Sequence, residues 1–273
     1  MQNKVRHQGA GLPAPFYVTS PAVLCGGPYF GRREGPPVSR PLFQLDNRLA
    51  LCAKFVRQDA ALADIGTDHA YLPVWLARAG KIKSALACDL REDPLRHGQA
   101  TIEKYHAGEL VKTRLSDGLQ NVSPEECDDI VIAGMGGELI VQILSNAPWV
   151  RDSGKRLILQ PMSRAEILRS YLSNEGFTIL QEKAVRSLGH IYSVMQCAYT
   201  GKKEMAGFLD IYTGALNPKE RPLDREYIEA VCRNLQKKAD GLHAAGNEDE
   251  SQSLADFIST LQKQAGIKEK GAV

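Results

Sequence analysis

Apolar residues recur along the chain in two alternating patterns. Short apolar runs, typical of buried strands, alternate with longer segments in which apolar residues return every three or four positions, as on one helical face. The runs that predict strands are 61–66, 84–89, 111–115, 129–133 and 155–160. The segments that predict helices lie near 71–79, 94–106, 138–145 and 164–175. Repeated strand–helix units predict a parallel sheet with helices on both faces.

Two further apolar runs, 177–185 and 191–199, are joined by the short segment RSLGH. This segment leaves no room for a crossover helix, so the two strands must pair antiparallel. Five strand–helix units closed by an antiparallel hairpin are typical of S-adenosyl-L-methionine (SAM) methyltransferases rather than of dinucleotide dehydrogenases. The predicted fold is therefore α/β: a class I SAM-dependent methyltransferase with a Rossmann-like, mostly parallel, seven-stranded sheet.

Regular patterning begins at Leu42, and a first helix is predicted from an apolar face. That face consists of Leu45, Leu49, Cys52, Ala53 and Val56. Beyond the sheet, segments 224–242 and 251–266 each carry an apolar stripe and are separated by the polar link HAAGNEDE. Two amphipathic helices with a short link predict an antiparallel coiled-coil hairpin. The predicted domains are a methyltransferase domain, 42–200, and a helical domain, 205–273.

Residues 1–41 differ in composition from the rest of the chain. They hold half of the 14 prolines and only one acidic residue. Such a segment has little apolar surface to bury. We expect a disordered tail or a non-native extension from a misplaced start codon; a basic arm that contacts RNA is the alternative.

Composition narrows the class of protein only modestly. The 273 residues are 43% hydrophobic and 24% charged with a net charge of +2, which is ordinary for a globular protein. No apolar run is long enough for a membrane span. The six cysteines are scattered, without metal-ligand spacing. We expect reduced thiols, no metal, no membrane association and a cytoplasmic location; the oligomeric state stays open, with a monomer one option.

The turn after the first strand, ADIGTDHAYLP, raises the question of its ligand. A dinucleotide needs several glycines near its pyrophosphate and no competing anion, but here Gly66 stands alone and Asp68 follows it. The NAD(P) oxidoreductase hypothesis thereby loses its main support. SAM lacks a phosphate and carries a sulfonium and an ammonium group, which suit an acidic turn.

Two more acids end successive strands. Asp89, followed by Leu90, is placed to accept hydrogen bonds from ribose hydroxyls, or to cap the next helix. Asp117 and Gly118 follow the third strand, where an acid would meet the adenine amino group or simply form a turn. Because carboxyl ends of parallel strands share one edge, these acids would line a single crevice.

Glycines and a Gln-Pro pair end the fourth and fifth strands. In IAGMGGELI the glycines remove side chains where donor and acceptor must approach, or only allow a tight turn. The residues concerned are Ala133, Gly134, Met135 and Gly136. Gln160 would bond a base edge and Pro161 would stiffen its backbone; a lead-in to the next helix is the alternative.

Three blocks, ADIGTDHAYLP, IAGMGGELI and RLILQP, in this order and spacing, resemble the TrmK family of bacterial tRNA (adenine-N1)-methyltransferases. The resemblance covers residues 42–200 closely, and the C-terminal helices resemble that family's coiled-coil domain. It implies a class I fold, SAM as cofactor, tRNA as partner and methylation of N1 of adenine 22. This chain departs from the family at Met162, where Asn is usual, and in its leader.

Carried over residue by residue, the resemblance implies that Asp64 and Gly66 border SAM and that Asp89 holds its ribose. Asp117 and Gly118 would lie at its adenine. Asp68 would act on the target base, with His69 orienting it or capping the helix, and Tyr71 stacking on the base or packing in the core.

Methylating a buried tRNA base requires extruding it, with Lys and Arg contacts to the backbone supplying energy. Arg233, Lys237 and Lys238 are the candidates; a solvated helix face is the alternative. Two other hypotheses stay open: a SAM-dependent methyltransferase for a small molecule or protein, and a non-catalytic RNA-binding relative.

Overall fold

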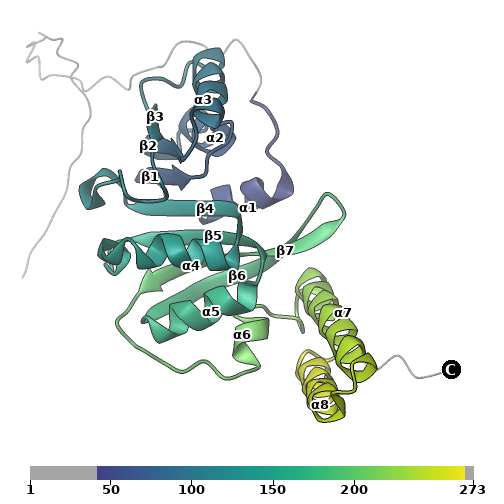
Figure 1. Cartoon of the computed structure of the whole chain (residues 1–273). Helices are drawn as coiled ribbons and strands as arrows, with labels where there is room; N and C mark the ends of the chain where they lie inside the picture. Colours follow the sequence, from purple (N-terminus) through teal and green to yellow (C-terminus); the bar gives the residue numbers. More distant parts are fainter. Residues whose placement is uncertain (1–41, 268–273) are drawn as a thin grey trace, which may run out of the picture. The chain divides into compact units, whose positions relative to one another are not determined.

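The computed structural model describes residues 42–267, so the 1–41 leader and the expectations attached to it lie outside the described residues. Seven strands form one sheet in the order β3-β2-β1-β4-β5-β7-β6 (Figure 1). Strands β1 to β5 are parallel, and β7 pairs antiparallel with both β5 and β6. Their bounds are β1 Ala60–Ile65, β2 Ile82–Asp89, β3 Val111–Leu115, β4 Asp129–Gly136, β5 Arg156–Ser163, β6 Phe177–Ser187 and β7 His190–Tyr199. The predicted strands and the antiparallel closing hairpin are confirmed.

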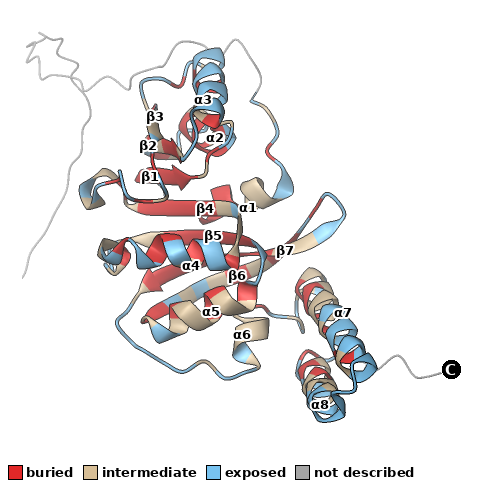
Figure 2. Ribbon diagram, in the orientation of Figure 1, coloured by how far each residue is buried: buried red, intermediate tan, exposed pale blue. Residues whose placement is uncertain are grey.

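Helices cover both faces of this sheet. They are α1 Asn47–Phe55, α2 Tyr71–Arg78, α3 Glu92–Lys104, α4 Gly137–Ser145 and α5 Ala165–Asn174; the short α6, Asp210–Thr213, packs on α5. Side chains of successive strand residues point to opposite faces. Accordingly Leu62 and Val131 pack in one cluster with α1 to α3, while Ile65 and Ile132 pack in another with α4 and α5. Figure 2 shows the central strands buried between these layers.

The buried sheet explains why the strand pattern is readable from sequence. All six residues of β1 are buried, as a strand covered on both faces requires. Helix α1 also buries the predicted face, with Cys52, Ala53 and Val56 in the core. The five cysteines within residues 42–267 are buried and free. In that same range, no helix is both long and apolar enough to cross a membrane.

The two C-terminal helices form a hairpin with a shorter link than the sequence predicted. Helix α7 spans Pro222–Ala244 and α8 spans Glu248–Gln264, so the acidic part of HAAGNEDE belongs to the first turn of α8. Acidic side chains there interact favourably with the positive end of the helix dipole, which explains the difference. Ile228 and Cys232 pack against Ile258 and Leu261. A supercoil, and the domain boundary near residues 200–205, stay predictions.

Buried polar contacts hold α7 against the sheet. The carboxylate of Asp224, fully buried, accepts hydrogen bonds from the backbone N–H groups of Ala184 (2.9 Å) and Asn217 (3.0 Å). Arg169 of α5 pairs with Glu182 of β6 at 2.7 Å and donates to the hydroxyl of Tyr227 at 3.4 Å. These contacts therefore fix the α7 helix against β6.

Removing the Arg169 side chain should be strongly destabilising. Arg169→Ala leaves the Glu182 carboxylate, fully buried, without its cation. We expect the free energy of unfolding to fall by about 3–5 kcal/mol in urea denaturation. The control is Arg186→Ala, which breaks the half-exposed pair with Glu226 and should cost under about 1 kcal/mol. Equal losses in the two variants would contradict the role of this buried pair.

Candidate functional site

The turn after β1 passes unusually close to the end of β4. Gly66 has φ of +78°, and a Cβ at this position would collide with the methyl group of Met135. The N–H groups of Gly66 and Thr67 both donate to the carbonyl of Cys88, at 2.8 and 2.9 Å. Glycine adopts this dihedral without strain, whereas the contact with Met135 involves only the flexible end of that side chain. The turn is tied to β2, and the ends of β1, β2 and β4 share one edge because these strands pair in parallel.

Asp64 is a buried acid at this edge. Its side chain accepts a hydrogen bond from the Thr67 hydroxyl at 2.6 Å. Burial raises the pKa of Asp64 from 3.8 to about 6; the Thr67 bond opposes the rise and the charge of Asp89 adds to it. Within residues 42–267, the second oxygen of Asp64 has no hydrogen-bond partner. The acid is thus poised to accept a cation or a donor group.

Asp89 and Asp117, the acids at the ends of β2 and β3, keep hydrogen-bonding capacity for a ligand. One oxygen of Asp89 accepts from the N–H of Arg91 (2.9 Å), but Arg91 is the N-cap residue of α3 and no side chain in the described part of the chain caps that helix. Leu90 beside it is 64% exposed. Asp117 is exposed and accepts from Gln120, while Gly118, with φ of +55°, packs closely on Ile143. These side chains leave an open rim at which ribose and adenine would lie.

The ends of β4 and β5 are joined by one buried amide. β4 continues three residues past the predicted end, through the irregular stretch Ala133–Gly136. Gln160, fully buried, accepts from the N–H of Gly134 (3.1 Å) and from Arg48 (3.0 Å) and donates to the carbonyl of Pro161 (2.9 Å). These bonds give Gln160 a structural role at the ends of β4 and β5, and its contact with a base edge stays a prediction.

Arg48, from α1, was not singled out by the sequence. Its guanidinium donates to Gln160 and to the sulfur of Met162 (3.4 Å), and lies 5.8 Å from the ring centroid of Tyr192. It is 112 residues from Gln160 in sequence, and no local pattern marks it. Arg48 places a cation at the β4–β5 edge and fixes the side chains around Met162. Pro161 is buried.

Asp68, His69 and Tyr71 form the rim above the Gly66 turn. Asp68, with φ of +40°, has 70% of its side chain exposed, and His69 Nε2 lies 3.5 Å from its carboxylate. His69 stacks between the rings of Tyr71 and His97, at centroid distances of 5.1 and 5.0 Å. The stack holds His69 in place beside an acid that is free to meet a substrate.

These rim residues also raise the question of a metal. Potential ligand atoms of Asp68, His69 and His97 lie within 4.8 Å of one another. The two imidazole planes are nearly parallel, with an angle of 15°. A metal prefers to lie in the plane of each ligating ring, and two stacked planes share no nearby point. The cluster is better suited to stacking than to coordination.

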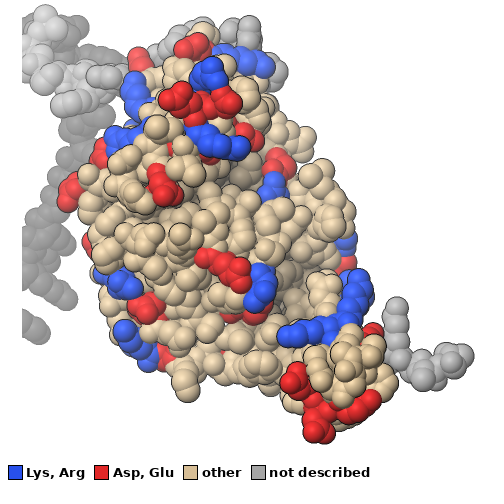
Figure 3. Space-filling view, in the orientation of Figure 1, with Lys and Arg blue, Asp and Glu red and all other residues tan. Residues whose placement is uncertain are grey.

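The three basic residues predicted to contact tRNA are all exposed on α7, and their contact with tRNA stays a prediction. Lys238 lines a groove between α7 and the sheet, whereas Arg233 and Lys237 are not among its lining residues. Figure 3 shows Lys and Arg side chains over the α7 region and acidic ones over α8. The basic surface is therefore on the α7 side of the hairpin.

The site fits SAM better than a phosphate ligand. A close glycine turn and two carboxylates near each other would repel a pyrophosphate but accept an ammonium group and ribose hydroxyls. The residues predicted to hold SAM lie at or next to the carboxyl ends of β1 to β4, and their contact with SAM stays a prediction: Asp64, Gly66, Asp89, Leu90, Asp117, Gly118, Ala133, Gly134, Met135 and Gly136.

Comparison with known proteins agrees with this chemistry. Residues 45–195 match the model of a methyltransferase domain family. The tRNA (adenine(22)-N(1))-methyltransferase of Bacillus subtilis is 29% identical over 232 residues, covering 81% of this chain and 96% of the relative.

Two solved structures are also similar. One is a candidate tRNA (m1A22) methyltransferase of Streptococcus pneumoniae in complex with SAM: 33% identity, TM-score 0.67, covering 79% of this chain and 97% of that one. The other is TrmK of M. capricolum in complex with S-adenosylhomocysteine: 27% identity, TM-score 0.68, covering 81% and 98%.

Fold, site and family model together define a methyltransferase domain of the Rossmann-like class. Within that class, the chain belongs to the TrmK family of tRNA (m1A22) methyltransferases.

Ionisation of Asp64 should make the free protein less stable as pH rises. The pKa of Asp64 in the folded protein, about 6, exceeds its ordinary value of 3.8. The stability that protonated Asp64 contributes is therefore fully present below pH 3.8 and is lost as the pH rises through about 6. Asp64→Asn mimics the protonated form. The variant should therefore gain about 1–3 kcal/mol over the wild type between pH 4 and pH 7, measured by urea denaturation without SAM. A pH-independent difference would contradict the raised pKa.

Proposed function

We propose that this protein methylates N1 of adenine 22 in tRNA, with SAM as the methyl donor. The observation that carries the proposal is the edge of the sheet at the carboxyl ends of β1 and β2, where the Gly66 turn lies beside the acids Asp64 and Asp89 in a chain of the TrmK family.

When bound, SAM supplies an electrophilic methyl group. In this proposal Asp64 accepts a hydrogen bond from the cationic methionine part, and Asp89 accepts from the ribose through the oxygen that Arg91 does not use. Gly66 and Gly134, both in the left-handed region, let the backbone pass close to the donor, beside the Met135 side chain. These residues orient the donor and contribute through proximity.

Asp68 is proposed to act on the acceptor base. N1 of adenine has a lone pair and no proton, so no base is needed before attack. The methylated adenine carries a positive charge, and a carboxylate beside it stabilises charge that is absent from the ground state. Asp68 is exposed at the rim, and His69, fixed by its stack with Tyr71 and His97, would keep the carboxylate oriented.

Arg48 is proposed as a positioning residue for the acceptor side. It holds Gln160 and Met162 together, and Gln160 in turn fixes the N–H of Gly134. Met162 stands where the family usually has Asn and is 41% exposed, so it presents an apolar surface to the acceptor instead of an amide.

The first test maps the product. The purified chain is incubated with unmodified tRNA and labelled SAM, and the modified nucleotide is located by primer extension and mass spectrometry. We expect 1-methyladenosine at position 22 and at no other adenine. A matched tRNA with guanosine at position 22 should take up no label. Methylation of a protein or small molecule but not of tRNA would support the other-acceptor hypothesis instead.

Replacing Asp68 separates chemistry from cofactor binding. Asp68→Asn keeps the size of the side chain and tolerates the left-handed dihedral, but it removes the charge. We expect kcat to fall by about 100-fold, a loss typical of removing one electrostatic stabiliser, while the Kd of SAM stays within twofold. Asp59→Asn is the matched control, because Asp59 is exposed, has φ of +58° and lies before β1, away from the site. Undiminished turnover in Asp68→Asn would rule out the role assigned to it.

A further inference from the structure

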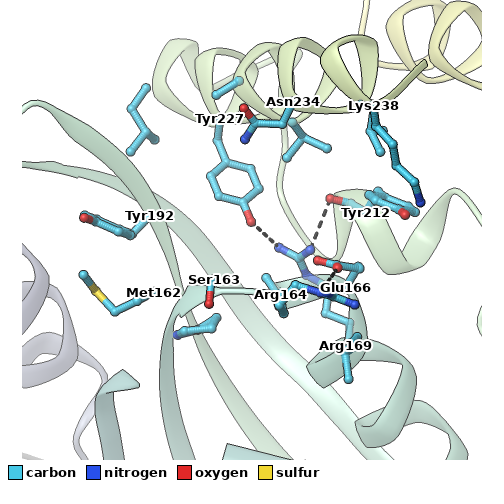
Figure 4. A pocket seen from close by; sticks show the side chains of 17 residues that line it. Met162, Ser163, Arg164, Glu166, Arg169, Tyr192, Tyr212, Tyr227, Asn234 and Lys238 are labelled. Carbon is cyan, nitrogen blue, oxygen red and sulfur yellow. Dashed lines mark hydrogen bonds and ion pairs between the residues drawn. The ribbon is translucent and has the colours of Figure 1, made fainter. Parts of the chain in front are cut away.

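A groove of about 590 Å³ lies between α7 and the carboxyl end of β5. Figure 4 shows Met162, Ser163 and Tyr192 toward one side of it and Lys238 toward the other, with Asn234 on α7 between them. The volume is within the range of small-ligand sites, roughly 300–1,000 Å³. The two α7 residues are one turn apart and therefore share a helix face.

The walls of this groove are held in place before any ligand binds. Arg169 is 3% exposed and donates to the carbonyls of Ile211 (3.0 Å) and Tyr212 (3.2 Å) as well as to Glu182 and Tyr227. It thereby connects α5, α6, β6 and α7 at one point. A groove with fixed walls loses little conformational entropy when it binds.

The groove is continuous with the acceptor side of the proposed methyl-transfer site. Met162 and Tyr192 line the groove, and Arg48 contacts both, through the sulfur of Met162 at 3.4 Å and over the ring of Tyr192 at 5.8 Å. Arg48 also holds Gln160, which fixes the end of β4. A molecule in the groove would therefore lie beside the substrate of the transfer reaction.

Polar groups without partners point to the kind of ligand. Within residues 42–267, the side chains of Asn234, Lys238 and Ser163 make no hydrogen bond or ion pair. Arg164 is paired with Glu166 at 2.9 Å, which leaves Lys238 as the unpaired cation of the groove among these residues. An amide, an ammonium group and an aromatic face are the groups that bind a base edge, a phosphate and a base plane.

We propose that this groove binds a nucleotide of the tRNA that neighbours the methylated adenine. The base contacts Met162 and Tyr192, the Asn234 amide bonds its edge, and Lys238 binds the adjoining phosphate. Holding a neighbour splayed from the stack would offset part of the cost of extruding the target base. The inference rests on the proposed function, since it names a second contact of the same substrate.

The test uses the full chain and steady-state kinetics with tRNA. Asn234→Ala and Lys238→Ala should each raise the KM for tRNA about 5- to 20-fold, with kcat and the Kd of SAM within twofold of the wild type. Lys238→Ala should also reduce the salt dependence of tRNA binding by about one phosphate contact. Asn234→Trp, which fills the groove from an exposed position, should raise the KM further without lowering the melting temperature.

The matched controls are Gln236→Ala on the exposed side of α7 and Lys263→Ala at the end of α8, neither of which lines the groove. Both should behave as the wild type. Groove variants with a KM for tRNA within twofold of an active wild type would overturn the inference. A wild type that makes no 1-methyladenosine would instead overturn the proposed function, so the two failures are distinguishable.

Discussion

The left-handed turn at Gly66 is the constraint on which the site depends. Glycine adopts its φ of +78° without strain, and the turn is tied to β2 through two hydrogen bonds to the carbonyl of Cys88. Because β1 pairs in parallel with β2 and β4, the ends of these three strands lie at the same edge of the sheet. The buried acid Asp64 follows from this geometry, because the turn closes over it and leaves only Thr67 as partner.

The acids at this edge decide what kind of ligand is acceptable. Asp64 keeps a raised pKa because burial and Asp89 both disfavour its charge, so an anionic ligand would add a further unfavourable interaction. A cationic ligand instead offsets the unfavourable free energy of the ionised, buried Asp64 carboxylate. The same logic applies at Asp68, where positive charge appears on the acceptor only as the methyl group is transferred. One electrostatic principle therefore accounts for both the donor and the acceptor side.

Much of the fold was predictable because burial imposes a strong pattern. β1 is apolar at nearly every position since helices cover both of its faces, and the short RSLGH segment allows only an antiparallel hairpin. The acids at strand ends were predictable for the same reason, since parallel strands share an edge. Arg48 and the α7 groove were not. Arg48 bonds Gln160, which is 112 positions away in the sequence. Asp224 and Arg169 hold α7 in place, and no local pattern in the sequence reveals that they are buried. Gln160 was recognised, but its role depends on Arg48 and Gly134, partners from two other segments.

The central claim is that the acids Asp64 and Asp89, at the carboxyl ends of β1 and β2, favour a cationic ligand over a pyrophosphate. Titration calorimetry of the same protein sample with SAM and with NAD⁺ tests it directly. We expect SAM to bind at one site per chain. We expect no heat of binding for NAD⁺ and no weakening of SAM binding in its presence. Binding of NAD⁺ with exclusion of SAM would contradict it.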